Sequence, residues 1–399
     1  MIWAAATPPS RDAALSRIDA IRPGDYARTR NHLAGAVTGL SPYLTHGLLT
    51  LPEILARLES RAPLAVGHKL VYEFGWREFF RHVWSFEGVG ILTSLRQGPL
   101  PEDSYAAALP PDIREARTGL PAVDEAVRTL YATGTLHNHA RMWLASYVVH
   151  LRRVHWRAGA DWLVAHLLDG DLASNHLSWQ WVAGTASHKP YLFNAENVAR
   201  YAPEPWHSPG SSIDRSYAEL DAIARGAAPS VVGTRDTMGL TPTAEPALFT
   251  APPSSLRIGR AASLAPKDVA GREVWLVHPW AMRAPPANLS RDAVVIGVYL
   301  QEHHADWPWP EARWRWVDAA MAAVTGARHY LSVAELAERL SDASVVRSVA
   351  DPHVSGLLER VAQLDEAPAL FPRVERPCRS FSQWWTRTTR GLERAGELL

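Results

Sequence analysis

The segment DGDLASNHLSWQW, residues 169–181, places unusual polar side chains on one face of a predicted helix. Asp171, Asn175, Ser178 and Trp179 fall at helical spacing, so a stripe that is normally apolar carries a carboxylate and an amide beside an indole. Alone, such a stripe is most simply explained by a polar helix end or by a solvated face.

Two other segments repeat this pattern. YEFGWREFF, residues 72–80, places Arg77 among aromatic residues, and LHNHARMWLASYVV, residues 136–149, does the same with Arg141. Buried charge is costly unless it is paired or bound to a ligand. Three such stripes in one helical region therefore indicate a pocket for a polar, aromatic ligand.

Apolar residues recur at helical spacing from Ser10 to Tyr201, with Gly and Pro between the segments. No alternating strand pattern of any length interrupts this region. The periodicity predicts helices around residues 11–22, 51–58, 67–84, 122–132, 136–153, 160–168 and 171–183. We therefore expect a helical domain over residues 1–206.

The composition changes twice after this region. Residues 207–270 are rich in Pro, Ser and Ala, which predicts a linker with one short helix at 217–225. EVWLVHPW and AVVIGVYL then read as strands, and the helical segment 310–324 begins the strand–helix alternation of a parallel sheet. The expected fold class is α + α/β, with a small Rossmann-like α/β domain at 271–372 and a helical junction at 373–399.

The composition narrows the function classes. The only cysteine, Cys378, excludes a disulfide framework and a protein-ligated iron–sulfur cluster, and we predict no metal site. The sequence contains no run of eighteen apolar residues, so it predicts no membrane-spanning helix. The start, MIWAAATPPSRD, lacks the features of a secretory signal, so we expect a cytoplasmic protein.

The net charge and the tryptophan content indicate the function less clearly than the cysteine count does. Lys and Arg total 41 and Asp and Glu total 41, so the formal net charge is zero, which argues mildly against tight non-specific DNA binding. The chain contains 17 tryptophans, which fit either a Trp-rich core or an aromatic site with an electron path.

Several long segments resemble, in order and spacing, the FAD domain of the photolyase and cryptochrome family. They cover about 190 residues and are Y-x-x-x-R-N at 26–31, GLSPYLTHG, YEFGWREFF, RTGLPAVDEAVRTL, HNHARM, DGDLASNHLSWQW, KPYLFNA and APEPWHSPGSSIDRSY. The resemblance implies a bent FAD at the centre of the helical domain.

The resemblance also implies which residues contact FAD. The family's phosphate loop corresponds to residues 37–41, where Val37 replaces the first threonine. Asn175 occupies the position facing flavin N5, and its amide is the choice typical of photolyases. The implied cofactor-binding residues are Tyr26, Thr38, Gly39, Leu40, Ser41, Arg77, Arg141, Asp169, Asp171 and Asn175. An antenna chromophore stays unknown.

Photoreduction in the family runs along a tryptophan chain. Trp179 matches its flavin-proximal member and Trp156 its middle member. The third position falls near Ile113, which cannot serve. The residues considered as substitutes, each also explained by core packing, are Trp84, Trp143, Trp162 and Tyr147.

The substrate positions distinguish repair classes within the family. The residues that meet a cyclobutane pyrimidine dimer correspond to Glu73, Asn138, Met142, Trp76 and Trp181. (6-4) photolyases carry histidines at the Asn and Met positions, so that class is disfavoured here. Thr135 and His139 replace groups near the DNA-facing rim and weaken the expected affinity for duplex DNA.

The resemblance thus implies light-driven repair of DNA containing pyrimidine dimers. The alternative is a cryptochrome-like photoreceptor that signals through a protein partner without repair. A third possibility, a FAD protein without photochemistry, is the least favoured.

The order of the domains differs from that of the family, whose α/β domain comes first. RPCRSFSQWWTRTT, residues 376–389, resembles the segment that joins the two domains in the family, so we expect a circular permutation. Fusion of an unrelated α/β domain is the alternative.

Overall fold

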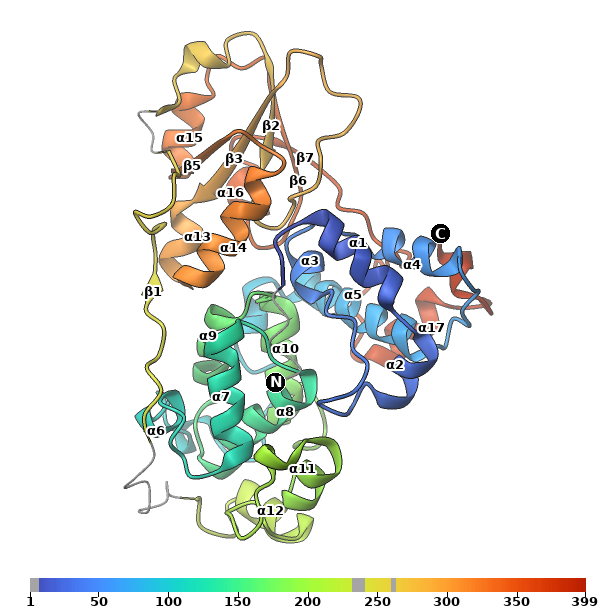
Figure 1. Ribbon diagram of the computed structural model, residues 1–399, viewed down its shortest axis with the longest axis vertical. Coiled ribbons are helices and arrows are strands. Elements are labelled where there is room, and N and C mark those ends of the chain that lie inside the picture. Colours follow the sequence, from blue (N-terminus) through green and yellow to red (C-terminus); the bar gives the residue numbers. More distant parts are fainter. Residues whose placement is uncertain (1–6, 232–240, 260–262) are drawn as a thin grey trace.

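The computed structural model describes residues 7–231, 241–259 and 263–399, in which a helical part precedes an α/β part (Figure 1). The helices of the first part are α1 (Arg11–Ala20), α2 (Pro23–Thr29), α3 (Ser41–Thr45), α4 (Leu51–Glu59), α5 (Lys69–Glu87), α6 (Pro111–Arg114), α7 (Pro121–Thr133), α8 (Asn138–Ser146), α9 (Trp156–His166), α10 (Leu172–Ala183), α11 (Ala195–Tyr201) and α12 (Tyr217–Ala224). Residues 1–6, and the pieces 232–240 and 260–262 of the predicted linker, lie outside the described residues.

The rest of the described chain contains a five-stranded sheet, a two-stranded sheet and several helices. Its strands are β1 (Leu248–Phe249), β2 (Glu273–Val277), β3 (Val294–Leu300), β4 (Trp309–Pro310), β5 (Ala327–Leu331), β6 (Val345–Val349) and β7 (Gln363–Asp365). Its helices are α13 (Gln301–Asp306), α14 (Glu311–Ala322), α15 (Val333–Arg339), α16 (Ser355–Leu358) and α17 (Phe381–Thr388). The predicted α + α/β fold class is confirmed.

Local sequence sets the ends of α10, which carries much of the polar stripe. The side chain of Asp171 caps the helix by accepting a hydrogen bond of 2.8 Å from the Ser174 backbone N–H. Gly184 ends the helix with φ of 84°, a left-handed conformation that glycine adopts without a steric penalty. The helix predicted at 171–183 is thus confirmed.

The other predicted helices are also present, with two differences. The segment predicted as one helix at 136–153 is α8 followed by a π-helical turn over Tyr147–Leu151. The helix predicted at 160–168 starts earlier, at Trp156, so its predicted start was wrong. The cause is His155, whose ring accepts a hydrogen bond from the Arg157 backbone N–H and so caps α9 without a Ser, Thr, Asp or Asn.

The predicted parallel sheet is confirmed. Its strand order is β5-β3-β2-β6-β7, and all four neighbouring pairs are parallel. Helices α13 and α14 connect β3 to β5, and α15 connects β5 to β6. The central strand β2 is buried from Val274 to Val277, as expected for a sheet covered on both faces.

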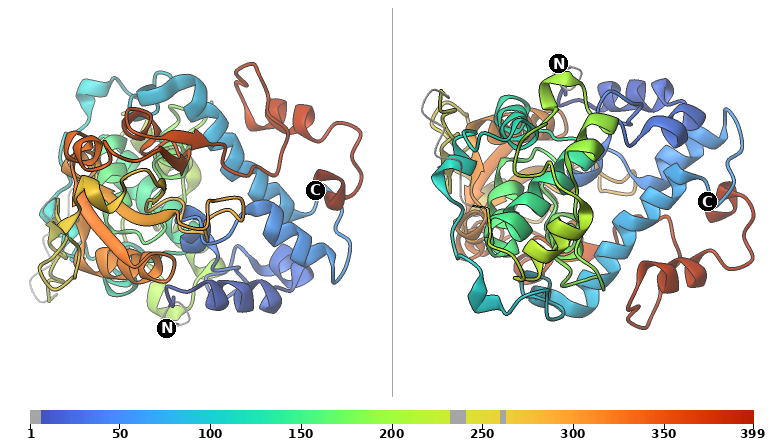
Figure 2. Two further views of the ribbon diagram at one scale, coloured as in Figure 1. Left: turned by 90° about the horizontal axis from the view of Figure 1, so that it is seen from above. Right: turned by 90° about the horizontal axis from the view of Figure 1, so that it is seen from below.

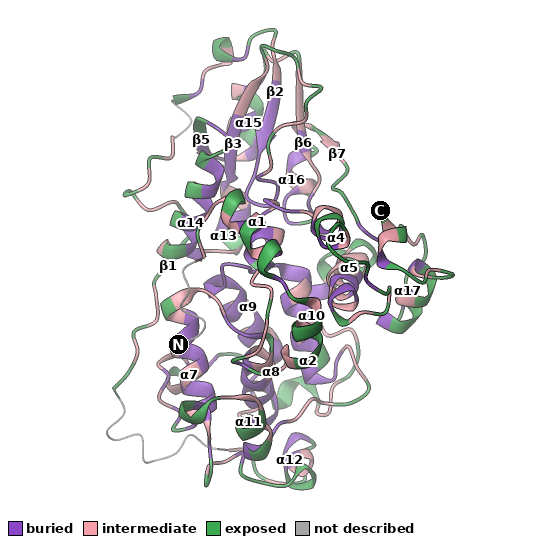
Figure 3. Cartoon of the chain, turned by 45° about the vertical axis from the view of Figure 1, so that its right-hand side comes forward, coloured by how far each residue is buried: buried purple, intermediate pink, exposed green. Residues whose placement is uncertain are grey.

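The segment after β2 joins the two parts. His46 of the helical part lies between them: its Nδ1 is 2.6 Å from the carbonyl oxygen of Pro279, and its Nε2 is 2.8 Å from that of Leu168. The backbone N–H of Met282 donates to the His46 carbonyl at 3.0 Å. Buried residues accordingly run from the sheet into α9 and α10 (Figure 3).

The C-terminal segment returns to the helical part, where α17 packs beside α5 (Figure 2). The rings of Phe381 and Trp76 stack with centroids 4.1 Å apart and planes 9° apart. In the predicted linker, β1 pairs with β4 in antiparallel fashion. Among the described helices, none is both long and apolar enough to cross a membrane.

Candidate functional site

One cavity of about 600 Å³ lies within the helical part, a size usual for ligand sites. It brings together thirteen of the predicted functional residues, although they come from segments far apart in sequence. Those residues are Tyr26, Thr38, Gly39, Ser41, Glu73, Trp76, Arg77, Asn138, Arg141, Met142, Asp169, Asp171 and Asn175. Trp179, predicted to transfer electrons, also lines the cavity.

Three predicted residues do not line this cavity. Leu40 is buried in the core just before α3, and Trp156 is buried with its indole N–H donating to Ser94 Oγ at 2.9 Å. Trp181 is 38% exposed and packs against Tyr191. Because residues two apart on an α-helix point in directions about 160° apart, Trp181 cannot share the face on which Trp179 meets the cavity.

One wall of the cavity holds two carboxylates that are paired with arginines. Arg141 Nη2 lies 2.9 and 2.8 Å from the two carboxylate oxygens of Asp169. Asp171 is 2.9 Å from Arg81 and 3.7 Å from Arg77. Burial alone would raise the pKa of Asp171, but the charges of Arg81 and Arg77 outweigh it and hold the pKa below its usual value. Asp171 is therefore an anion at neutral pH.

Asn175 and Trp179 follow this wall along α10. The Asn175 amide is 8% exposed, and its Nδ2 donates to the Ala160 carbonyl at 2.8 Å, which fixes the amide at the cavity surface. Trp179 lies against α9 at Gly159, where a Cβ would come within 2.3 Å of the indole ring. A short residue on α9 thus makes room for the large ring on α10.

Another part of the cavity lining includes a cationic side chain, Arg17, beside a glycine, Gly39. Gly39 has φ of 62°, and a Cβ at this position would lie 2.5 Å from Arg17 Nη1. A side chain at residue 39 would therefore displace the guanidinium. The Thr38 hydroxyl accepts a hydrogen bond of 3.3 Å from the Leu40 backbone N–H. Val37, which replaces the family's first threonine, is 38% exposed and supplies no hydroxyl.

These groups fit the FAD that the sequence resemblance implies. Four arginines line the cavity, and guanidinium groups suit a pyrophosphate because they are planar, always charged and donate in pairs. Aromatic and apolar side chains suit the ring systems. The arginines are Arg17, Arg30, Arg77 and Arg141, and the aromatic residues are Tyr26, Phe74, Trp76, Phe80 and Trp179.

Four of the five predicted substrate residues, Glu73, Trp76, Asn138 and Met142, line the cavity from α5 and α8. Glu73 forms an ion pair with Arg30 at 2.9 Å. Burial raises the pKa of Glu73, and the charge of Arg30 only partly offsets this effect. Asn138 Nδ2 donates to the Met142 sulfur at 3.5 Å, so both residues belong to the same wall.

The rim residues that depart from the family are engaged within the protein. The Thr135 hydroxyl lies 3.0 Å from that of Thr133, and the His139 ring lies 5.2 Å from that of Tyr201. Burial lowers the pKa of His137 to about 3 and that of His139 to about 4, with neighbouring positive groups adding to the effect. Both histidines are therefore neutral at physiological pH.

No residue is assigned as the third member of the predicted electron-transfer chain. Ile113 is fully buried in α6. Trp143 and Tyr147 are core residues, Trp162 donates to Glu245 at 3.0 Å, and Trp84 lies 4.9 Å from the ring of His353. None of these four residues lines the cavity as the structure describes it.

Sequence reasoning missed five charged or polar groups at or behind the cavity. Arg17 and Arg30 line it, whereas Arg81, Asp351 and His353 form a network behind Asp171. Arg81 follows Arg77 by one helical turn, and that spacing was the available signal. No local pattern pointed to Asp351, because it is 270 residues from Arg81.

Comparison with known proteins agrees with this geometry. Residues 70–223 match the family model for the FAD binding domain of DNA photolyase. A deoxyribodipyrimidine photo-lyase of Streptomyces griseus is 35% identical over 164 residues, which cover 41% of this chain and 36% of that one. A deoxyribodipyrimidine photo-lyase of Vibrio cholerae is 35% identical over 212 residues, covering 50% and 44%.

Cryptochromes match as well. Cryptochrome DASH of Synechocystis sp. is 33% identical over 172 residues, covering 40% of this chain and 34% of that one. A solved Synechocystis cryptochrome structure aligns with 29% identity and a TM-score of 0.43, covering 48% and 43%. The chain spans less than half the length of these curated relatives. The family match and the sequence relatives show that the helical part of this chain contains a photolyase-type FAD-binding domain over residues 70–223, with FAD as its cofactor.

Proposed function

We propose that this chain repairs cyclobutane pyrimidine dimers in DNA in a light-driven reaction. The observation that carries the proposal is that Glu73, Asn138 and Met142 line the same cavity as Asp169, Asp171 and Asn175. The residues expected to hold FAD and those expected to meet the dimer therefore share one space. Electron transfer from cofactor to lesion needs that proximity.

Reduced FAD, when bound, would supply an electron to the dimer under blue light and would regain it after the ring opens, so the reaction would consume no reductant. The protein must hold the lesion against the cofactor and stabilise the negative charge that the lesion gains. Glu73 suits this task because it lines the cavity and because burial raises its pKa, which makes the protonated, hydrogen-bond-donating form easier to reach than in an exposed glutamate. The Asn138 amide is a second donor on the same wall.

The aromatic groups would hold the bases of a flipped-out dimer by stacking. Trp76 is well placed for this role because it lines the cavity and its ring stacks on that of Phe381, with centroids 4.1 Å apart. Trp181 is 38% exposed, so we propose that it meets DNA at the mouth of the site rather than in the cavity.

A blue-light photoreceptor that signals through a protein partner is the second candidate function. The zero formal net charge supports it, since a DNA-binding protein usually carries an excess of basic residues. His139, held against Tyr201 and neutral at physiological pH, also supports it, because it offers no positive charge to a phosphate at the rim.

A repair assay separates the two functions. The photoreduced protein is mixed with dimer-containing DNA, and thymine absorbance is followed in blue light and in darkness. Repair predicts recovery of absorbance in light only. A sample replete with FAD that gives no recovery would favour the photoreceptor function.

A further inference from the structure

The segment that carries Asp169 and Asp171 is held from behind by the α/β part. Arg313 of α14 is 2% exposed, and it donates to the carbonyl oxygens of Val164 at 2.9 Å and Gly170 at 2.8 Å. These carbonyls flank Asp169 in sequence, so the α/β part fixes the backbone on which the cavity carboxylates stand.

A second contact reaches the carboxylate of Asp171 itself. Arg81 bridges two buried anions, with Nη2 at 2.9 Å from Asp171 and Nη1 at 2.8 Å from Asp351. Asp351 lies two residues after the end of β6 in the α/β part. One guanidinium is therefore shared between a carboxylate of the cavity and a carboxylate of the other part.

A third contact holds the first turn of α10. The backbone N–H of Leu172 donates to His353 Nε2 at 3.1 Å, so this nitrogen carries no proton. The proton of the neutral ring is then on Nδ1, which lies 2.6 Å from Asp351 Oδ1 and donates to it. Asp351 thus orients the histidine that holds the helix beginning at Leu172.

We propose that Asp351 and His353 are positioning residues of the FAD site, acting through Arg81 and the first turn of α10. The inference rests on the proposed flavin function of the cavity and deepens it, because it makes the α/β part a component of the cofactor site. The sharing of Arg81 has an electrostatic consequence. Without the charge of Asp351, Arg81 would act on Asp171 alone and the surroundings of the cavity would lose a negative charge.

The test compares Asp351→Asn with the wild-type holoprotein. We expect the Kd for FAD to rise roughly tenfold or more, the factor that corresponds to about 1.4 kcal/mol. We also expect the midpoint potential of the bound flavin to become more positive, because reduction adds negative charge that Asp351 no longer opposes. An unchanged Kd together with an unchanged potential would overturn the proposal.

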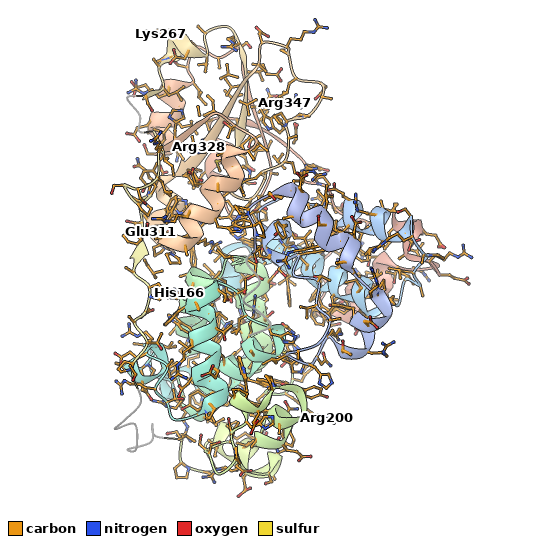
Figure 4. The ribbon with its side chains drawn as sticks, in the orientation of Figure 1. His166, Arg200, Lys267, Glu311, Arg328 and Arg347 are labelled. Atoms are coloured by element: carbon orange, nitrogen blue, oxygen red, sulfur yellow. The ribbon has the colours of Figure 1, made fainter. Side chains whose placement is uncertain are left out.

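Asp365→Asn is the matched control. Arg347 also bridges two carboxylates, those of Glu273 at 3.2 Å and Asp365 at 2.7 Å, and Figure 4 shows Arg347 among the strands, far from the helical part. This variant loses an ion pair of the α/β part at a more exposed carboxylate, and it should keep both the Kd and the potential of the wild type. An equal shift in both variants would reduce the effect of Asp351 to general destabilisation and would contradict the proposal.

Substitutions of His353 keep the proposal testable if Asp351→Asn fails to fold. His353→Gln retains an acceptor for the Leu172 N–H, whereas His353→Ala removes it. We expect the glutamine variant to bind FAD more tightly than the alanine variant, and equal affinities would count against a role in positioning. If the wild-type chain binds FAD but repairs no DNA, the proposed repair function is wrong. The FAD measurements would still test whether Asp351 and His353 position the FAD site.

Discussion

The indole ring of Trp179 packs directly on the backbone of Gly159. A Cβ at residue 159 would lie 2.3 Å from Cζ3 of the ring, closer than atoms in contact can approach. Helices α9 and α10 are therefore close at this point because residue 159 has no side chain, and their approach places Trp179 at the cavity.

Gly159→Ala should push Trp179 toward the cavity or separate α9 from α10. We expect a loss of about 1–3 kcal/mol in the free energy of unfolding, the usual cost of overpacking a core, together with weaker FAD binding. Chemical denaturation and FAD titration measure the two effects. Gly356→Ala in α16 is the control, because no atom lies within 4 Å of its added Cβ. Equal behaviour of the two variants would contradict this packing.

Trp179→Phe tests the electron path. Phenylalanine keeps an aromatic ring at the site but is much harder to oxidise than tryptophan. Photoreduction of bound FAD, followed by absorbance, should slow at least severalfold while the FAD content stays unchanged. Trp275→Phe in β2 is the control for loss of a buried tryptophan outside the helical part. Photoreduction at the wild-type rate in Trp179→Phe would show that this residue is not the first donor.

Glu73→Ala should lower the rate of dimer repair by about tenfold or more, since each 1.4 kcal/mol of lost stabilisation is a factor of ten. Glu73→Gln keeps a hydrogen-bond donor and should recover part of that loss. FAD content should stay near the wild-type value in both variants. Glu311, which is partly exposed on α14 and labelled in Figure 4, provides the control Glu311→Ala. Wild-type repair by Glu73→Ala would exclude a role in the reaction.

His304 makes the stability of the protein sensitive to acid. Burial lowers its pKa from 6.5 to about 3, with the charge of Arg313 adding to the effect. Below pH 6.5 the unfolded chain binds a proton at this residue that the folded chain does not, so stability falls as the pH drops from 6.5 toward 3.

His304→Phe should therefore lose less stability than the wild type between pH 7 and pH 5. The expected difference is about 2 kcal/mol, from a slope of about 1.4 kcal/mol per pH unit below 6.5. Chemical denaturation at the two pH values measures it, with His188→Gln at an exposed position as the control. Parallel losses in wild type and His304→Phe would contradict this source of acid sensitivity.

The helices and the parallel sheet were predictable because their signals are local. Apolar periodicity marks α4, α5 and α7, and the β-branched runs mark β2 and β3. The start of α9 was not predictable, because the helix is capped by His155, and histidine is not one of the usual capping residues. The permuted order of the two parts stays a prediction.

The candidate site was predictable where its residues stand in recognisable segments, as Asp169, Arg141 and Asn175 do. The ion pair between Arg81 and Asp351 was not predictable, because contacts between distant segments leave no periodic signal in a single sequence. The location of Trp181 was not predicted, because the resemblance grouped it with the substrate residues, whereas helix geometry turns it away from the face on which Trp179 meets the cavity.

The most direct test of the account is the number of dimers repaired per bound FAD in a defined oligonucleotide under continuous blue light. Because the electron returns after each cleavage, we predict many repaired dimers per FAD in light and none in darkness. No repair, or no more than one dimer repaired per FAD, would contradict a catalytic repair site in this cavity.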